Sequence, residues 1–213
     1  MINANADAMG IIFPNNYDKF VPELVSERLM ASIPFASRYR MIDFLLSSMV
    51  GCGIDKIEVL VRENYHSLVD HLGGGREWDL SRKNGGLSIF PPFAQKSIGS
   101  MGGGRVEALA NILPVLKKQK EKYVIMADTN IAANFDFNAL IAQHVKTDAD
   151  ITFAYTKEEL PEELTGAKDA SKGLYYTLKL DGDKVEDIYI NKQDQGVQNF
   201  SMNIYIANRE WLI

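Results

Sequence analysis

The sequence predicts an α/β protein with a mixed, mostly parallel sheet and helices on both faces. Up to Asp150, short apolar runs typical of buried strands alternate with segments whose apolar residues have helical spacing. Such alternation is typical of a parallel sheet flanked by helices. After Asp150 the strands become more frequent, which indicates an added hairpin or a mixed part of the sheet. With 213 residues, of which 46% are hydrophobic, the chain can bury a full core without disulfides or metals.

The first part of the chain supplies the parallel strands and the helices between them. Buried strands are expected at 11–13 (IIF), 56–61 (KIEVLV) and 123–127 (YVIMA). Helices are expected at 41–50, 66–72, 105–119 and 137–145. Gly51 and Gly53 should end the first helix. Pro114 should kink or break the third, because proline lacks the N–H that a helix interior needs.

The remaining segments are expected to be loops and later strands. The stretch 73–104 is rich in Gly and Pro and is expected to be irregular. Further strands are expected at 150–155, 175–180, 185–190 and 203–207, with a turn at Asp181–Asp183 joining two of them. Asn208 has the character of an N-cap whose helix has barely begun. We therefore expect one domain, 1–213, truncated at its C-terminal end.

Charge and composition exclude several classes of function. The net charge of −5 argues against nucleic acid as a partner, because phosphate backbones are held by clustered Lys and Arg. No apolar run approaches the roughly 20 residues that span a membrane. Cys52 is the single cysteine, which rules out an internal disulfide and suits a reducing cytoplasm. No spacing of His, Cys or acidic residues indicates a metal site.

Ligands of open parallel sheets bind at the C-terminal ends of the strands, here the segments 14–23, 62–65, 99–105 and 128–134. With their neighbours IPFASRYRMIDFLLSSMVGCGI (33–54) and REWDLSRKNGGLSIFPPF (76–93), these segments resemble the glucose-1-phosphate adenylyltransferase (ADP-glucose pyrophosphorylase) family. The resemblance implies a Rossmann-like nucleotide-diphosphosugar transferase fold. It also implies a C-terminal β-helix domain that this chain lacks.

The loop after the first strand departs from the family pattern. The family carries a glycine-rich loop here, whose backbone amides approach a triphosphate, and a lysine downstream. This chain instead has Pro14, Asn15, Asn16, Tyr17 and Asp18, and proline offers no amide proton at all. The position that matches the lysine is Met30. The loop is therefore expected to keep the place of a phosphate site without its chemistry.

A second departure follows the third strand. The family ends this strand with an aspartate that helps to hold Mg²⁺, and the gap-free match for it is Thr129. A shift of one residue would restore Asp128. Threonine is a poor Mg²⁺ ligand, since this cation is usually held by carboxylates and phosphates. The alternative is that Asp128 only shapes a turn.

Other positions could keep part of the family's binding functions. By resemblance, Lys192 could bind the sugar phosphate and Asn203 stands where the family has a glycine near the sugar, while Asn191 replaces a glutamate. The loop with Gly103, Gly104 and Arg105 would contact the nucleotide. The alternatives are a solvated lysine at a strand end for Lys192 and a plain turn and helix cap for the loop.

Arg38 and Arg40 precede the first helix and could bind an anionic, phosphorylated effector. The alternative for this pair is a surface ion pair between Arg40 and Asp43 at helical spacing.

The resemblance as a whole favours a degenerate, non-catalytic subunit of the GlgD type, which would regulate or support a catalytic partner in a hetero-oligomer. No cofactor is expected in this chain, and Mg²⁺ is expected in the active partner. An active glucose-1-phosphate adenylyltransferase that uses Asp128 and Lys192 is the alternative. A dinucleotide-binding oxidoreductase is a weaker alternative, since no Gly-x-Gly-x-x-Gly follows the first strand.

Overall fold

A computed structural model describes residues 7–14, 16–83, 85–91, 104–165 and 174–213. The chain divides into two compact units, one formed by 1–152 with 205–213 and the other by 153–204. None of the helices in these described ranges is long and apolar enough to cross a membrane.

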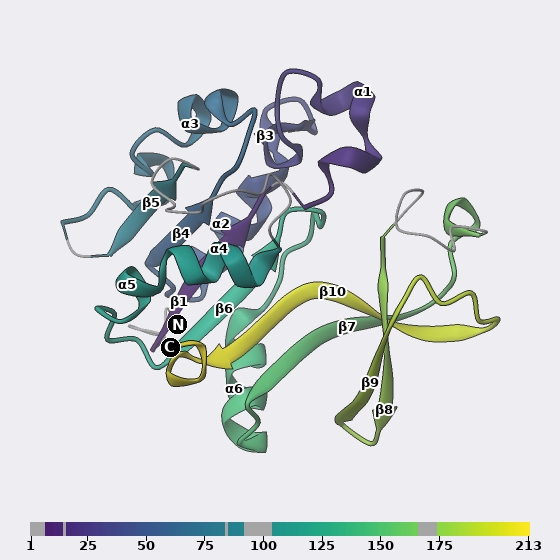
Figure 1. Ribbon diagram of the computed structural model, residues 1–213. Coiled ribbons are helices and arrows are strands. Elements are labelled where there is room, and N and C mark those ends of the chain that lie inside the picture. The colour runs from purple at the N-terminus through teal and green to yellow at the C-terminus, as the bar shows by residue number, and fades with distance from the viewer. Residues whose placement is uncertain (1–6, 15, 84, 92–103, 166–173) are drawn as a thin grey trace. The chain divides into compact units, whose positions relative to one another are not determined.

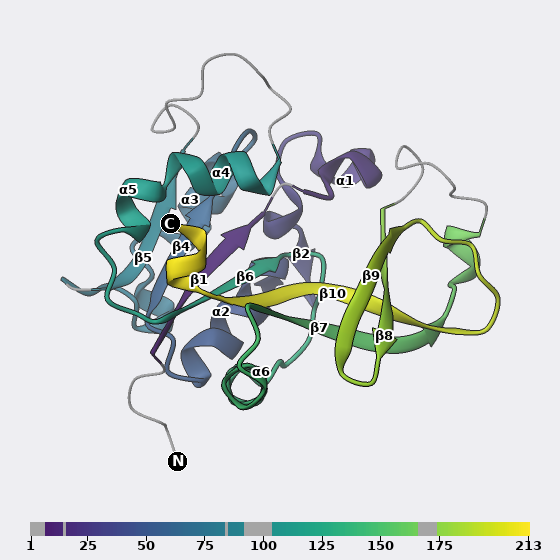
Figure 2. The same cartoon turned by 60° about the horizontal axis from the view of Figure 1, so that its bottom comes forward.

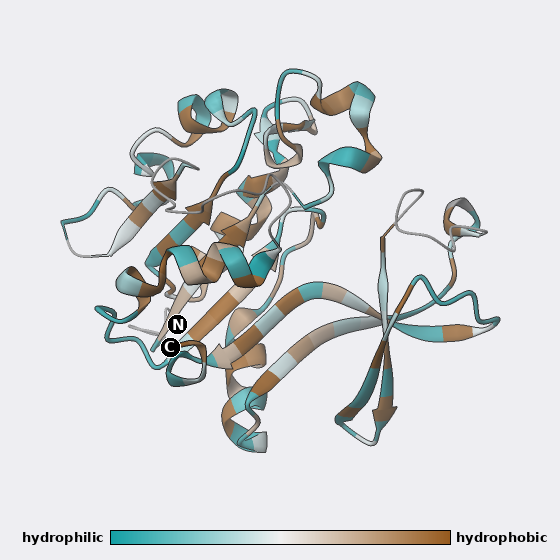
Figure 3. Cartoon of the chain, in the orientation of Figure 1, coloured by the Kyte–Doolittle hydropathy of each residue, from teal (hydrophilic) through white to brown (hydrophobic). Residues whose placement is uncertain are grey.

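The first unit is built on a parallel sheet. Its strands are β1 (Ala8–Phe13), β4 (Lys56–Leu60), β5 (Gly86–Phe90) and β6 (Tyr123–Asp128), in the order β5-β4-β1-β6. β1 is parallel to both β4 and β6, and every residue of β1 and β6 is buried. Apolar residues gather along these central strands in Figure 3. The mostly parallel sheet and the three strands predicted from apolar runs are therefore confirmed.

Helices cover both faces of this sheet, as predicted. The longer ones are α2 (Met41–Gly51) and α6 (Phe137–Thr147), and the shorter ones are α3 (His66–Leu72), α4 (Arg105–Asn111) and α5 (Leu113–Leu116). Figure 1 and Figure 2 show α4 and α5 on one face and α2 and α6 on the other. On the α4 face, Met9 and Ile11 of β1 pack in one buried cluster with Ile112 and Leu116. Pro114 separates α4 from α5, so the predicted third helix is broken as expected.

Two strand pairs were missed by the sequence analysis. β5 lies inside the stretch expected to be irregular and pairs in register with β4, from Lys56↔Gly86 to Leu60↔Phe90. Gly86 permits this approach, because its φ is 84° and a Cβ there would lie 2.3 Å from the carbonyl oxygen of Leu80. A small antiparallel ribbon, β2 (Pro34–Phe35) and β3 (Tyr39–Arg40), directly precedes α2.

Several single turns join these elements. They are η1 (Asp18–Phe20), α1 (Pro22–Val25), η2 (Met30–Ser32), η3 (Arg76–Trp78), η5 (Glu162–Leu164) and η6 (Arg209–Leu212). Asn208 holds the N-cap position of η6, but its side chain makes no capping bond and donates to the carbonyl of Ala149 at 3.4 Å.

The second unit is a group of antiparallel strands. β8 (Tyr176–Asp181) and β9 (Lys184–Ile190) form a hairpin that turns at Gly182, as the sequence predicted. β10 (Val197–Asn208) pairs with β8 and with β7 (Ile151–Glu159). β10 is longer than the strand expected at 203–207, and its last residues, from Tyr205 on, belong to the first unit.

Candidate functional site

The candidate site lies at the C-terminal edge of the parallel sheet, where β1 and β6 end side by side. Phe13 and Asp128 are register partners at the ends of these strands. The segments that begin at Pro14 and Thr129 therefore leave the sheet together. Ligands of open α/β sheets bind at such an edge.

Asp128 is the centre of this edge. It is fully buried, and both carboxylate oxygens have partners. Asn16 donates to Oδ1 from its side-chain amide at 2.6 Å, and Arg105 donates from Nε to Oδ1 at 3.4 Å and from a terminal nitrogen to Oδ2. Burial raises the pKa of the Asp128 carboxyl, while Arg105 and Asn16 oppose the rise. A neutral Asp128 would leave the guanidinium of Arg105 without a counter-charge, so the ionised pair is the stable form at neutral pH.

Arg105, the first residue of α4, is fixed by aromatic rings as well as by Asp128. Its guanidinium carbon lies 6.0 Å from the centre of the Phe13 ring and 5.5 Å from that of the Tyr205 ring. Burial works against its charge, but the attraction to Asp128 outweighs this and raises the pKa of Arg105 above its ordinary value. A cation placed over aromatic faces is further stabilised by the ring electrons.

The loop after β1 is held by its own polar groups. The hydroxyl of Thr129, which is buried, donates to the carbonyl oxygen of Pro14 at 3.4 Å. Asp18 accepts a hydrogen bond at 2.8 Å from the backbone N–H of Met30, the position at which the resemblance implies a lysine in the family. Apart from Arg105, this edge thus has no cationic side chain at the positions Thr129, Pro14 and Met30. Asn15 lies outside the described residues.

The residues that the structure describes at this edge do not fit a divalent cation. Among the described ranges, no group of three or more His, Cys, Asp or Glu side chains could hold a metal ion. Asp128 is the carboxylate at the edge, and its oxygens are occupied by Arg105 and Asn16. Mg²⁺ needs free carboxylate or phosphate oxygens and keeps several waters.

The expected nucleotide loop is described only in part. Gly104 precedes α4 with extended backbone angles, and Gly103 lies outside the described residues. Arg105, which was expected to contact a nucleotide, is instead bound to Asp128. The sequence reasoning treated these two residues separately, since the positions are 23 residues apart and no local pattern connects them.

The expected sugar-phosphate residues belong to the second unit. The ammonium of Lys192 lies 2.7 Å from Asp194, whose hydrogen bond raises the pKa of Lys192, and 4.2 Å from the centre of the Tyr189 ring. Asn191 is buried, and its side-chain oxygen accepts from the backbone N–H of Tyr175 at 3.0 Å. The side-chain amide of Asn191 thus ties the segment after β9 to the start of β8.

Asn203 has a backbone conformation that suits the family's glycine. Its φ is 55°, in the left-handed region, where asparagine is among the few residues other than glycine that occur. A glycine at this position could adopt the same backbone conformation.

Arg38 and Arg40 lie in different environments. Arg40 donates from its guanidinium to the carbonyl and hydroxyl oxygens of Ser67, at 2.6 and 2.7 Å. The expected ion pair between the side chains of Arg40 and Asp43 is replaced by other contacts. Asp43 is buried, accepts a hydrogen bond from the backbone N–H of Arg40, and lies 2.6 Å from the ring nitrogen Nε2 of His71. Arg38 is exposed, and its guanidinium carbon lies 5.6 Å from the centre of the Tyr39 ring.

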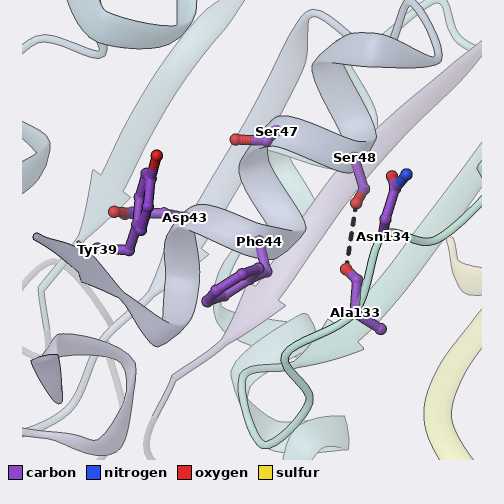
Figure 4. Close-up of a pocket in the computed structure, with 7 residues that line it drawn as sticks. All are labelled: Tyr39, Asp43, Phe44, Ser47, Ser48, Ala133 and Asn134. Atoms are coloured by element: carbon purple, nitrogen blue, oxygen red, sulfur yellow. Dashed lines mark hydrogen bonds between the residues drawn. The ribbon is translucent and has the colours of Figure 1, made fainter. Parts of the chain in front are cut away.

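A small pocket beside α2 was not foreseen from the sequence. It has a volume of about 200 Å³ and is lined by Tyr39, Asp43, Phe44, Ser47, Ser48, Ala133 and Asn134 (Figure 4). The hydroxyl of Ser48 donates to the carbonyl of Ala133 at 3.5 Å and accepts from the backbone N–H of Phe135 at 3.1 Å, which fixes the loop after β6 on α2. The pocket walls come from segments far apart in the chain, so no sequence motif marks them.

Comparisons with known proteins agree with this architecture. The chain is 36% identical over 151 residues to the glycogen biosynthesis protein GlgD of Geobacillus stearothermophilus, covering 70% of this chain and 43% of that protein. It is 31% identical over 195 residues to the glucose-1-phosphate adenylyltransferase of Clostridium novyi, covering 89% of this chain and 49% of that protein. The chain thus spans less than half the length of these curated relatives.

A solved structure and a family profile were also matched. A Bacillus anthracis protein described as a glucose-1-phosphate thymidylyltransferase has a similar fold, with a TM-score of 0.69 at 13% identity over 95% of this chain and 72% of that one. The profile described as nucleotidyl transferase matches residues 23–168. The chain therefore belongs to the nucleotidyl transferase family.

Proposed function

We propose that this protein is a subunit of ADP-glucose pyrophosphorylase in glycogen biosynthesis, degenerate at its ATP and Mg²⁺ site. It would regulate or support a catalytic glucose-1-phosphate adenylyltransferase subunit. The reaction of that partner is ATP + glucose 1-phosphate → ADP-glucose + pyrophosphate. The GlgD relatives and the adenylyltransferase relatives support this assignment through their similarity to the chain. The proposed location is the cytoplasm.

The observation that carries the proposal is the ion pair of Asp128 and Arg105 at the end of β6. Nucleotidyl transfer needs a metal ion and cationic or amide groups that balance the charge of a triphosphate. Here the carboxylate at the edge is bound by a side chain of the same protein. Met30 is an uncharged residue at the position where the resemblance implies a lysine in the family. Pro14 further removes one amide donor from the loop after β1. Mg²⁺ would act in the catalytic partner, and this chain would need no cofactor.

One observation favours the alternative of an active adenylyltransferase. Lys192 is retained, and its ammonium group is partly exposed, so it could still meet an anionic sugar phosphate. However, Lys192 binds the sugar substrate in that scheme and does not replace the metal or the lysine at the Met30 position. The regulatory role therefore agrees better with the residues at the edge of the sheet.

The decisive experiment compares three preparations in an assay for ADP-glucose. They are this protein alone, the adenylyltransferase of the same organism alone, and the two together. An equal concentration of an unrelated protein mixed with the adenylyltransferase is the control. We expect no product from this protein alone, and a changed kcat or effector response of the mixture together with co-elution in gel filtration. Turnover by this protein alone at the rate of its partner would contradict the proposal, and so would a mixture that behaves like the control.

A further inference from the structure

We propose that Arg105 is a built-in cation that takes the place of a divalent metal ion at Asp128 and thereby keeps metal ions out of the site. The inference rests on one part of the proposed function, namely that this edge is a nucleotide site that does not catalyse nucleotidyl transfer. It adds a physical cause for the loss of metal binding and assigns that cause to one side chain.

The first argument is the completeness of the contacts around Asp128. The carboxylate is fully buried, one oxygen accepts from Asn16 and Arg105, and the other accepts from Arg105. A hydrated metal ion binds through carboxylate oxygens that are open to its water shell. No such oxygen is open at Asp128, so a metal ion could enter only by displacing Arg105.

The second argument is the cost of that displacement. The guanidinium carbon of Arg105 lies 6.0 Å from the centre of the Phe13 ring and 5.5 Å from that of the Tyr205 ring, and its side chain is 26% exposed. A metal ion that took Asp128 would leave this largely buried guanidinium without a counter-charge, which is unfavourable. Because the pair is already neutral in sum, the site also lacks the net negative charge that attracts a divalent cation.

The third argument concerns what remains when Arg105 is removed. Among the described residues, Asp128 would keep only the amide of Asn16 as a donor, and a buried carboxylate in this state must take up a proton or a cation. A divalent ion at millimolar concentration can meet this need through this one carboxylate, because it keeps several of its own waters as the other ligands. Asp128 is therefore a latent metal ligand, and Arg105 is the group that masks it.

The test uses the wild type and three variants, Arg105→Gln, Asp128→Asn and the double variant with both changes. Glutamine keeps much of the stem of arginine and an amide donor but removes the charge. The double variant removes both charges and serves as the matched, neutral control. Thermal unfolding of each protein is followed with and without millimolar MnCl₂, and bound Mn²⁺ is counted by electron paramagnetic resonance.

We expect that Mn²⁺ leaves the melting temperature of the wild type unchanged and raises that of Arg105→Gln by several degrees, because a ligand that binds only the folded state stabilises it. The Asp128→Asn variant and the double variant should show no such shift. If Arg105→Gln is unfolded in metal-free buffer, circular dichroism should show that Mn²⁺ restores the fold, and no recovery would overturn the proposal.

Three further results would overturn it. They are a Mn²⁺ shift in the wild type that Asp128→Asn removes, a folded Arg105→Gln without any Mn²⁺ response, and a response of the double variant equal to that of Arg105→Gln. None of these depends on the ADP-glucose assay with the partner. Failure of the metal-exclusion inference is thus distinguishable from failure of the proposed function.

Discussion

The packing of α2 against Gly10 of β1 predicts how a substitution at Gly10 changes the free energy of unfolding. A Cβ added at Gly10 would lie 2.8 Å from the sulfur of Met49, 3.4 Å from its methyl carbon and 3.5 Å from a side-chain carbon of Ile57. Met49 and Ile57 are fully buried, so neither can move into solvent. Gly10→Ala should therefore force a shift of the Met49 side chain.

The size of the effect follows from two opposing contributions. Overpacking of a core costs about 1–3 kcal/mol, while replacing glycine in a strand by alanine gains roughly 0.5–1 kcal/mol. We expect a net loss of about 0–2.5 kcal/mol in the free energy of unfolding, centred near about 1 kcal/mol and measured by urea denaturation. The melting temperature should fall by about 2–4 °C per kcal/mol for a chain of this length.

Two companion variants isolate the cause. Gly51→Ala is the matched control, because nothing lies within 4 Å of a Cβ at Gly51, at the end of α2, and it should be neutral or stabilising. In a Met49→Ala background, Gly10→Ala should cost nothing, since the clash partner is gone and part of the cavity is filled. The reasoning is refuted if Gly10→Ala is as stable as Gly51→Ala, or if its cost is the same with and without Met49.

Three further predictions concern charge and binding. Burial raises the pKa of Glu58 above the ordinary 4.5, against the opposing effects of Ser88 and Lys56. Neutral Glu58 therefore contributes fully to the free energy of unfolding below pH 4.5, and this contribution is lost as the pH rises through the pKa of the folded state. Glu58→Gln should thus raise the urea midpoint at pH 8 but not below pH 4.5, and an equal gain at both would show that ionisation is not the cause. Arg40→Ala should lower the free energy of unfolding by about 1.5–3 kcal/mol through the lost bonds to Ser67, whereas Arg38→Ala should change it by less than about 0.5 kcal/mol; equal effects in urea denaturation would contradict the contacts described. Mg·ATP should bind only in the millimolar range or more weakly, because the loop with Pro14 lacks the glycine amides and the cation of a phosphate site, and calorimetry that gave a micromolar Kd would exclude this view.

Local patterns were enough to predict much of the fold. The apolar runs of β1, β4 and β6 and the helical spacing in α2 and α6 depend only on neighbouring residues, and these elements appear where they were expected. β5 was not predicted, because its formation depends on the close approach of Gly86 to Leu80 and on pairing with β4. These are contacts of the folded chain that leave no periodic signal in the stretch 73–104.

The candidate site could be located from the sequence but not described in its chemistry. The positions Pro14, Asn16, Met30, Asp128 and Thr129 were identified as altered, and Asp128 was taken either as a metal ligand or as a turn residue. It is the acceptor of an ion pair with Arg105, and the bond from Asn16 crosses 112 positions of the chain. Whether such side chains meet depends on the register of β1 and β6, which the sequence does not specify.

The buried pair of Asp128 and Arg105 also bears on how such a protein can evolve. Changing only one partner leaves an uncompensated buried charge, which costs about 3–5 kcal/mol, a large part of the roughly 5–15 kcal/mol that stabilises a typical domain. Under the proposed function, a lineage that loses Arg105 alone keeps a stable fold only where a divalent ion takes its place at Asp128. Natural selection for folding would then act against a change of either partner alone, independently of any selection on catalysis.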